Sequence, residues 1–248
     1  MCILSFQHPK YVLHSTPFAR PPHNTPIMSQ LPVAAPELEQ CIEHNQTALS
    51  TVYTYNDLPP SEIELWGRFA SYSVLVGQPN EDRALILLRV ISTILAPSMC
   101  DHNIKVRRLA EITVTSDPNA RGFNQGPGTK DGQRMLNETT GMYDTDVIGI
   151  RLRDDNGFLP LEVILDSVAH ELSHCWHMNH GTAFLQRWNG LMDEVENDLG
   201  GRLTLPRGAG EYAAQLEAAG SVEMGASRKP SRRGIAAMKM WKSMNASQ

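Results

Sequence analysis

The run HELSHCWHMNH, residues 170–180, decides how the rest of the chain is interpreted. His170 and His174 stand four residues apart, so a helix would place both imidazoles on one face, about one turn apart. Glu171 follows the first histidine, and His180 comes six residues after the second. This is the H-E-x-x-H zinc motif with a third histidine, an arrangement that leaves the fourth tetrahedral position for water. The pattern therefore predicts a catalytic rather than a structural zinc site.

The residues before the motif have the pattern of an amphipathic helix. Pro160 and Glu162 stand early, where helix starts prefer proline and an acid. An apolar stripe follows on one face, made of Leu161, Ile164, Leu165, Val168 and Leu172. The two motif histidines point roughly the opposite way, which predicts a helix anchored on a core with its histidines facing a cleft. The alternative is a surface helix with scattered histidines.

The predicted chemistry is hydrolysis by a metal-activated water. A Zn²⁺ ion held by three histidines would lower the pKa of its bound water and polarise a scissile carbonyl. Glu171 would take the proton of that water and pass it to the leaving amine. Its position turns it about 100° from His170, which makes it a poor fourth ligand. No tyrosine or arginine stands at a spacing diagnostic of an oxyanion-stabilising group.

His177 leaves two questions open. It stands where metzincins have a glycine that turns the chain towards the third ligand, which argues against a true metzincin. Asn179 or Gly181 could supply a positive-φ turn instead. His177 could also replace His180 as a ligand, although at three residues from His174 we expect it to point elsewhere.

Two acids could orient the imidazoles through hydrogen bonds, as carboxylates often do around zinc. They are Asp166, four residues before the first histidine, and Asp193, on the segment after the motif. Roles as helix charges are the favoured interpretation for both. Cys175, near the apolar stripe, is expected to be a small buried side chain rather than a redox group.

Composition places the chain among ordinary globular proteins. It has 248 residues, 41% hydrophobic and 20% charged, with a formal net charge of −5. No run of about eighteen apolar residues occurs, so no membrane span is expected. The four cysteines form no C-x-x-C pair, which favours a reducing compartment and opposes a disulfide framework.

Four regions are expected along the chain. Residues 1–36 hold seven of the sixteen prolines and no acid, which predicts a disordered tail. Residues 37–64 are expected to be a linker or short helix, and residues 65–205 a catalytic domain. Residues 206–248 are basic at their end, with no acid after Glu223, and are expected to be a flexible tail. Ile235, Met238 and Trp241 could instead share one face of a short basic helix that contacts nucleic-acid phosphates.

Within the expected domain, periodicity predicts an α+β fold. An apolar helix capped by Asn80 is expected through Leu95, and another helix from Thr182 to Leu199. Residues 108–116 and 146–153 alternate like strands. Residues 119–144 are expected to form a long loop with a short strand at 122–124. Trp66 and Phe69 stand at helical spacing. We expect a small sheet packed against helices, with the motif helix central.

These residues resemble the WLM-domain metalloproteases, the weak-suppressor-like proteases related to the Spartan group. The similarity rests on residues 170–174, His180-Gly181 and Phe184, preceded by Ile150 to Arg153 and Phe158 to Pro160. Further pieces match in order over about residues 65–200; they are Arg83 to Leu85, Leu88, Ala96 to Met99, Leu109 to Glu111 and Gly122 to Asn124. The resemblance implies a zincin-like fold, one catalytic zinc ion on His170, His174 and His180, and Glu171 as catalytic base.

The resemblance also implies partners. The family is implicated in degrading proteins crosslinked to DNA, so DNA-stimulated cleavage of DNA-associated protein substrates in the nucleus or cytoplasm is expected. SUMO-modified proteins are expected as partners from the resemblance alone, because the C-terminal region has no obvious SUMO-interaction run. Two other classes stay open: a general zinc peptidase without DNA dependence, and an inactive metal-binding adaptor. An intact Glu171 argues against the adaptor.

Overall fold

The computed structural model describes residues 50–54, 69–113, 120–126, 129–130, 133–134, 143–208, 211–221 and 229–246. The expected Pro-rich tail at 1–36, the expected short helix before residue 50 and Trp66 lie outside these residues. The described part belongs to one compact unit, Leu31–Gln248.

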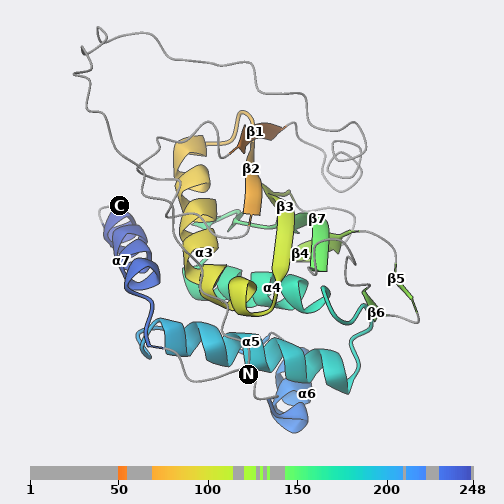
Figure 1. The fold of residues 1–248 in the computed structure, drawn as a ribbon. Helices are drawn as coiled ribbons and strands as arrows, with labels where there is room; N and C mark the ends of the chain where they lie inside the picture. Colours follow the sequence, from red (N-terminus) through yellow and green to blue (C-terminus); the bar gives the residue numbers. More distant parts are fainter. Residues whose placement is uncertain are drawn as a thin grey trace, which may run out of the picture. The chain divides into compact units, whose positions relative to one another are not determined.

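A five-stranded mixed sheet forms one layer of this unit (Figure 1). Its strands follow the order β1 (Ser50–Thr54), β2 (Phe69–Leu75), β3 (Ile104–Glu111), β7 (Tyr143–Ile150) and β4 (Gly122–Gln125). The three central strands run parallel, whereas β1 and β4 pair antiparallel to their neighbours. Four short strands form two separate hairpins, β5 (Thr129–Lys130) with β6 (Gln133–Arg134) and β8 (Arg153–Asp154) with β9 (Gly157–Phe158).

The expected strands exist, with shifted boundaries. The short strand expected at 122–124 is confirmed as β4, and the strand expected at 146–153 begins earlier, at Tyr143. The helical spacing of Phe69 is misleading, because Phe69 begins the buried strand β2. Strand β1 lies inside the stretch expected to be a linker or short helix. Its pairing partner, β2, is about twenty residues away, so local pattern could not reveal it.

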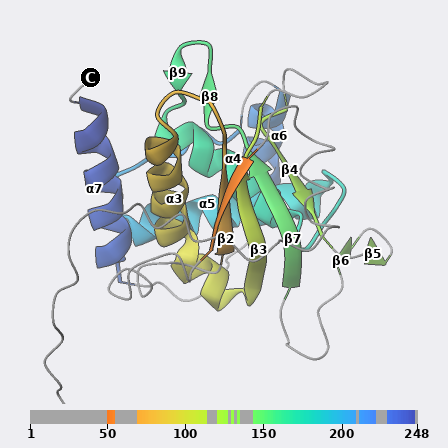
Figure 2. The same cartoon turned by 90° about the horizontal axis from the view of Figure 1, so that it is seen from above.

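Five helices complete the described part of the domain: α3 (Glu81–Asp101), α4 (Leu161–Ser173), α5 (Thr182–Asp198), α6 (Glu211–Ala219) and α7 (Arg232–Ala246). Helix α3 joins the parallel strands β2 and β3 and packs against both. Helix α4 packs against β4 and β7, and α5 lies across α3 and α4 (Figure 2). This is the expected α+β fold, with the motif helix between the sheet and a further helix.

Helix α3 is apolar nearly all round, as expected. It is the one described helix long and apolar enough to cross a membrane by length and composition, but 67% of its most apolar window is buried inside the protein. That burial is the pattern of a core helix. Asn80 precedes it in a left-handed conformation and makes no side-chain cap; its carbonyl accepts bonds from the Arg83 and Ala84 amides.

The C-terminal region differs from the flexible tail that composition suggested. Both α6 and α7 are helices, and Trp241 in α7 is fully buried with Met238 beside it in the core. Helix α7 packs against α3, and the Arg83 guanidinium lies 5.4 Å from the Trp241 ring. A tail rich in lysine and arginine thus becomes ordered because two apolar side chains on one face find the core.

Candidate metal centre

The centre begins with helix α4, which the core holds in place. Pro160 precedes the helix in an extended conformation, and all five members of the predicted apolar stripe are buried. The helix ends at Ser173, so His170 lies in its last turn and His174 directly follows it with helical backbone angles. Core packing of the stripe therefore fixes the direction in which both imidazoles leave the helix.

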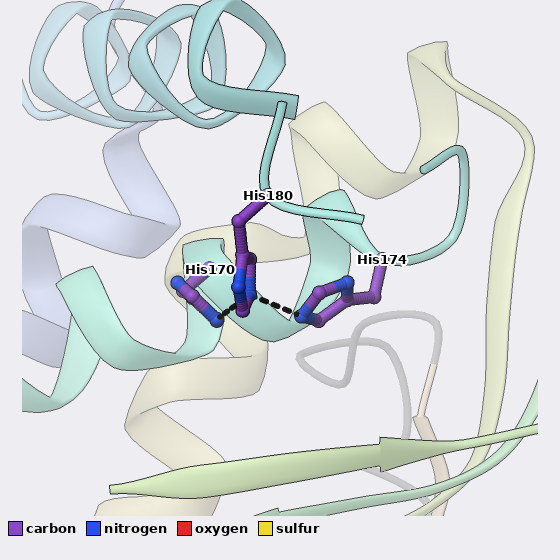
Figure 3. Close-up of side chains that lie close together, drawn as sticks. All are labelled: His170, His174 and His180. Carbon is purple, nitrogen blue, oxygen red and sulfur yellow. Dashed lines mark hydrogen bonds between the residues drawn. The ribbon is translucent and has the colours of Figure 1, made fainter. Parts of the chain in front are cut away.

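The three predicted ligands lie together (Figure 3). The Nε2 atom of His180 is 3.2 Å from Nε2 of His170 and 3.2 Å from Nε2 of His174. Nitrogens at the usual zinc distance of about 2.0–2.1 Å in a tetrahedral site stand about 3.3–3.4 Å apart. The two distances from His180 thus match the spacing of a tetrahedral metal site, all three ligand nitrogens lie within 4.8 Å of one another, and the group could hold a metal ion. His177 is not part of this group.

The connection after α4 reaches His180 without the positive-φ turn that Asn179 or Gly181 could have supplied. Neither residue has a positive φ angle, and Gly181 has an extended backbone with a φ of −79°. Two overlapping bonds tighten the end of the helix instead, from the Cys175 amide to Leu172 and from the Trp176 amide to Ser173. The carbonyl of His177 then accepts a bond from Nδ1 of His174 at 2.9 Å. His177, the alternative candidate ligand, therefore orients the His174 ring through its backbone carbonyl.

Aromatic rings cover the histidines on the side of α5. Phe184 lies 4.9 Å from the His170 ring and 4.6 Å from the His174 ring, and Trp188 lies 4.6 Å from His170, as ring centroids. Burial among these rings lowers the pKa of His170 to about 3, and burial also lowers the pKa of His180. Metal ligation needs neutral imidazoles, and this desolvation keeps His170 neutral at pH 7.

Glu171 is buried, and burial raises its pKa to about 8. Edge strand β4 lies against this part of α4, because the side-chain amide of Asn124 donates a 2.6 Å hydrogen bond to the backbone carbonyl of Glu171. A Cβ atom on Gly122 would lie 3.0 Å from Glu171 Cγ and 2.8 Å from the Gly149 carbonyl oxygen. Glycine at position 122 thus leaves the room that the glutamate side chain occupies.

The two acids considered as partners of the imidazoles have other partners. Asp166 accepts bonds from the Gly208 amide at 3.1 and 3.2 Å, and Asp193 pairs with Arg207 at 2.7 Å. Burial raises the pKa of Asp166 to about 6. Both carboxylates therefore anchor the segment that leads into α6. This segment leads to Tyr212 of α6, whose hydroxyl lies 3.1 Å from His180 Nδ1. The sequence pattern did not predict this residue as part of the site.

The WLM domain model matches residues 68–231, which is more than half of the chain. The chain belongs to the WLM family. WLM proteins are metalloproteases, and the histidine group of this WLM protein lies within the matched residues, whereas α7 follows them.

Solved structures of two yeast proteins are similar to this WLM protein. Wss1 from Saccharomyces cerevisiae is 26% identical, with a TM-score of 0.41, over 52% of this chain and 90% of that one. Wss1 from S. pombe is 24% identical, with a TM-score of 0.37, over 53% and 93%. No curated protein sequence matches the chain significantly.

Proposed function

We propose that this WLM protein is a zinc-dependent endopeptidase. The observation that carries the proposal is the convergence of three imidazole nitrogens, with His180 Nε2 3.2 Å from Nε2 of both His170 and His174, beside the buried Glu171 of α4. His170, His174 and His180 would hold the ion. When bound, zinc supplies Lewis-acid chemistry, acidifying a water molecule and polarising the scissile carbonyl.

Glu171 is the proposed general base. It would accept the proton of the attacking water and deliver that proton to the leaving amine. Its burial makes the carboxylate a stronger base than an exposed one, because desolvation disfavours the charged form. A divalent cation beside it favours ionisation, since an opposite charge lowers the pKa of a carboxyl. The two effects together suit a group that must both take and release a proton near neutral pH.

We further propose DNA-associated or DNA-crosslinked proteins as substrates and the nucleus or cytoplasm as location. Helix α7 supports this, because it exposes Arg232, Arg233, Lys239 and Lys242 and carries no acid. Clustered cations bind phosphates without reading base sequence, which suits a protease that acts wherever a protein is held on DNA. SUMO-modified substrates remain an expectation from the family resemblance alone.

The decisive experiment compares the wild type with Glu171→Gln on a DNA-bound basic protein, with zinc content measured for both. We expect about one zinc per chain in each and cleavage by the wild type alone. Glu217→Gln, an exposed glutamate of α6, is the matched control and should retain activity. Zinc without cleavage by any of the three would favour the metal-binding adaptor, and absence of zinc would overturn the proposal.

DNA dependence is tested separately with the double variant Arg232→Gln/Lys239→Gln. We expect weaker DNA affinity, a smaller dependence of affinity on salt, and unchanged cleavage of an unbound peptide. Lys105→Gln, an exposed lysine on β3, is the control. Equal cleavage with and without single-stranded DNA would instead indicate a general zinc peptidase.

A further inference from the structure

Tyr212, in the first turn of α6, lies against the third histidine. Its hydroxyl is 3.1 Å from His180 Nδ1, and its ring meets the His180 ring edge-on at 5.4 Å between centroids. His180 differs from the other two histidines because it lies on the connection between α4 and α5 and is exposed. The rotamers of helical side chains are restricted by the helix itself, whereas those of a side chain on a connection are not. His180 therefore depends most on a contact that fixes its ring.

The direction of this hydrogen bond follows from the geometry of the three rings. Nε2 of His180 faces the other two histidines, so Nε2 must carry the lone pair that a metal ion uses. The proton of the neutral imidazole then sits on Nδ1, which donates to the Tyr212 hydroxyl oxygen. His174 has the same arrangement, with Nδ1 donating to the His177 carbonyl. A hydroxyl from a separate helix thus does for His180 what the local backbone does for His174.

Helix α6 is held firmly enough to position a hydroxyl. Asn189 of α5, itself buried, donates 2.7 Å bonds to the carbonyls of Leu216 and Gly220 and so satisfies the C-terminal end of α6. Leu216 is 1% exposed and belongs to the core. The segment before α6 is tied by Asp166 to the Gly208 amide. Both ends of the helix are therefore fixed to α4 and α5, the elements that also frame the histidines.

The close packing at Gly208 adds a second constraint. Gly208 has φ +78°, and a Cβ there would lie 2.9 Å from Leu216 Cδ1 and 3.2 Å from Tyr212 Cβ. A larger residue would strain the backbone and push α6 away from its place. The approach of Tyr212 to the centre is thus built into the segment that precedes it.

We propose that Tyr212 is a positioning residue that holds His180 in the tautomer and orientation required for metal binding. The inference rests on the proposed zinc function, and it assigns Tyr212 no proton transfer. Its role is to keep Nδ1 protonated and the ring aimed at the point where the three Nε2 atoms meet. Partners of this kind elsewhere contribute about 10- to 100-fold to metal affinity.

The test is Tyr212→Phe, which keeps the ring against Trp188 and removes only the hydroxyl. Zinc affinity is measured by competition with a chromophoric chelator, and the exchange of the His180 Nδ1 proton by NMR of the zinc-loaded full chain. We expect affinity to fall by about 10-fold or more, faster exchange of that proton, and an unchanged melting temperature of the metal-free protein. Tyr143→Phe is the matched control, because that ring packs on Trp176 instead; it should leave both readouts unchanged.

The outcomes separate the two proposals. A wild-type chain that binds no zinc overturns the proposed function and this inference with it. Zinc binding with equal affinity in wild type and Tyr212→Phe overturns the inference alone. Loss of affinity accompanied by a lower melting temperature of the metal-free variant would also overturn it, since the hydroxyl would then support the fold rather than the ligand.

Discussion

Helices α4 and α6 both lie next to the three histidines, and different forces hold these two helices. Helix α4 is fixed by apolar burial: its stripe, from Leu161 to Leu172, lies in the core. Helix α6 contributes Leu216 to the core and is otherwise tied by polar bonds from Asn189 and by the anchoring of Gly208. Burial of an apolar stripe contributes more to the free energy of unfolding and is lost only when the whole domain unfolds. Single hydrogen bonds contribute about 1 kcal/mol each and can open locally. We therefore expect the position of His170 on α4 to be lost only by global unfolding, and the contact from α6 to be lost by local opening.

The largest expected effect is that of Leu172→Ala in α4. Leu172 is fully buried, so removing its side chain leaves a cavity and should lower the free energy of unfolding by about 2–5 kcal/mol. Urea unfolding of the metal-free protein measures it. Leu216→Ala in α6 is the comparison, and we expect a smaller loss because that site lies in a helix that can collapse locally. Equal losses would contradict the distinction between the helices.

The next prediction concerns Asp166 of α4, which accepts a hydrogen bond from Gly208 in the segment before α6. Burial raises its pKa from 3.8 to about 6, so the folded state binds a proton more tightly than the unfolded state. Proton binding by Asp166 therefore stabilises the folded state; this contribution is complete below pH 4 and is lost as the pH rises through 6. As the pH rises from 4 to 7, Asp166→Asn should therefore become more stable than the wild type, and the difference in unfolding free energy should grow by up to about 3 kcal/mol. Unfolding free energies of both proteins across that range measure it; a difference that stays constant with pH would refute the assignment.

Asn189→Ala should release α6 while leaving α4 in place. The change leaves the carbonyls of Leu216 and Gly220 without these donors, at a cost of about 1–3 kcal/mol. Hydrogen exchange should become faster in residues 211–219 and stay unchanged in residues 161–173. Zinc affinity should fall by as much as in Tyr212→Phe. Faster exchange in α4 as well would mean that the two helices open together.

The smallest expected effect concerns the sheet side of α4. Gly122→Ala would bring a methyl group to 2.8 Å from the Gly149 carbonyl oxygen and 3.0 Å from Glu171 Cγ, so strand β4 and the Glu171 side chain must both shift. We expect a cleavage rate lower by roughly 10-fold, because small displacements of a catalytic group are costly, and an unchanged zinc content. Full activity in this variant would show that Glu171 tolerates the displacement. The result separates the base from the ligands, which Tyr212→Phe perturbs instead.

Much of the site could be predicted because its parts are close in sequence. Helical geometry relates His170 to His174, and His180 follows within one short connection. The apolar stripe of α4 and the strand β4 were also predictable from local pattern. The positive-φ turn that Asn179 or Gly181 could have supplied does not occur, and two backbone bonds tighten the chain at the end of α4 instead. For α7, composition favoured a flexible tail, but the alternative of a short helix with Ile235, Met238 and Trp241 on one face agrees with the structure.

By itself, the sequence determined the candidate ligand set, the candidate base and the α+β class, because motif spacing, helix periodicity and strand alternation depend on neighbouring residues alone. Only the tertiary structure decided which polar groups surround that set. Tyr212 lies 32 residues from His180, and Asn124 lies 47 residues from Glu171. Asp166 is bound to Gly208 rather than to an imidazole. Such contacts depend on how helices and strands pack in space, and a local sequence pattern does not predict which distant side chain will contact the histidines or Glu171.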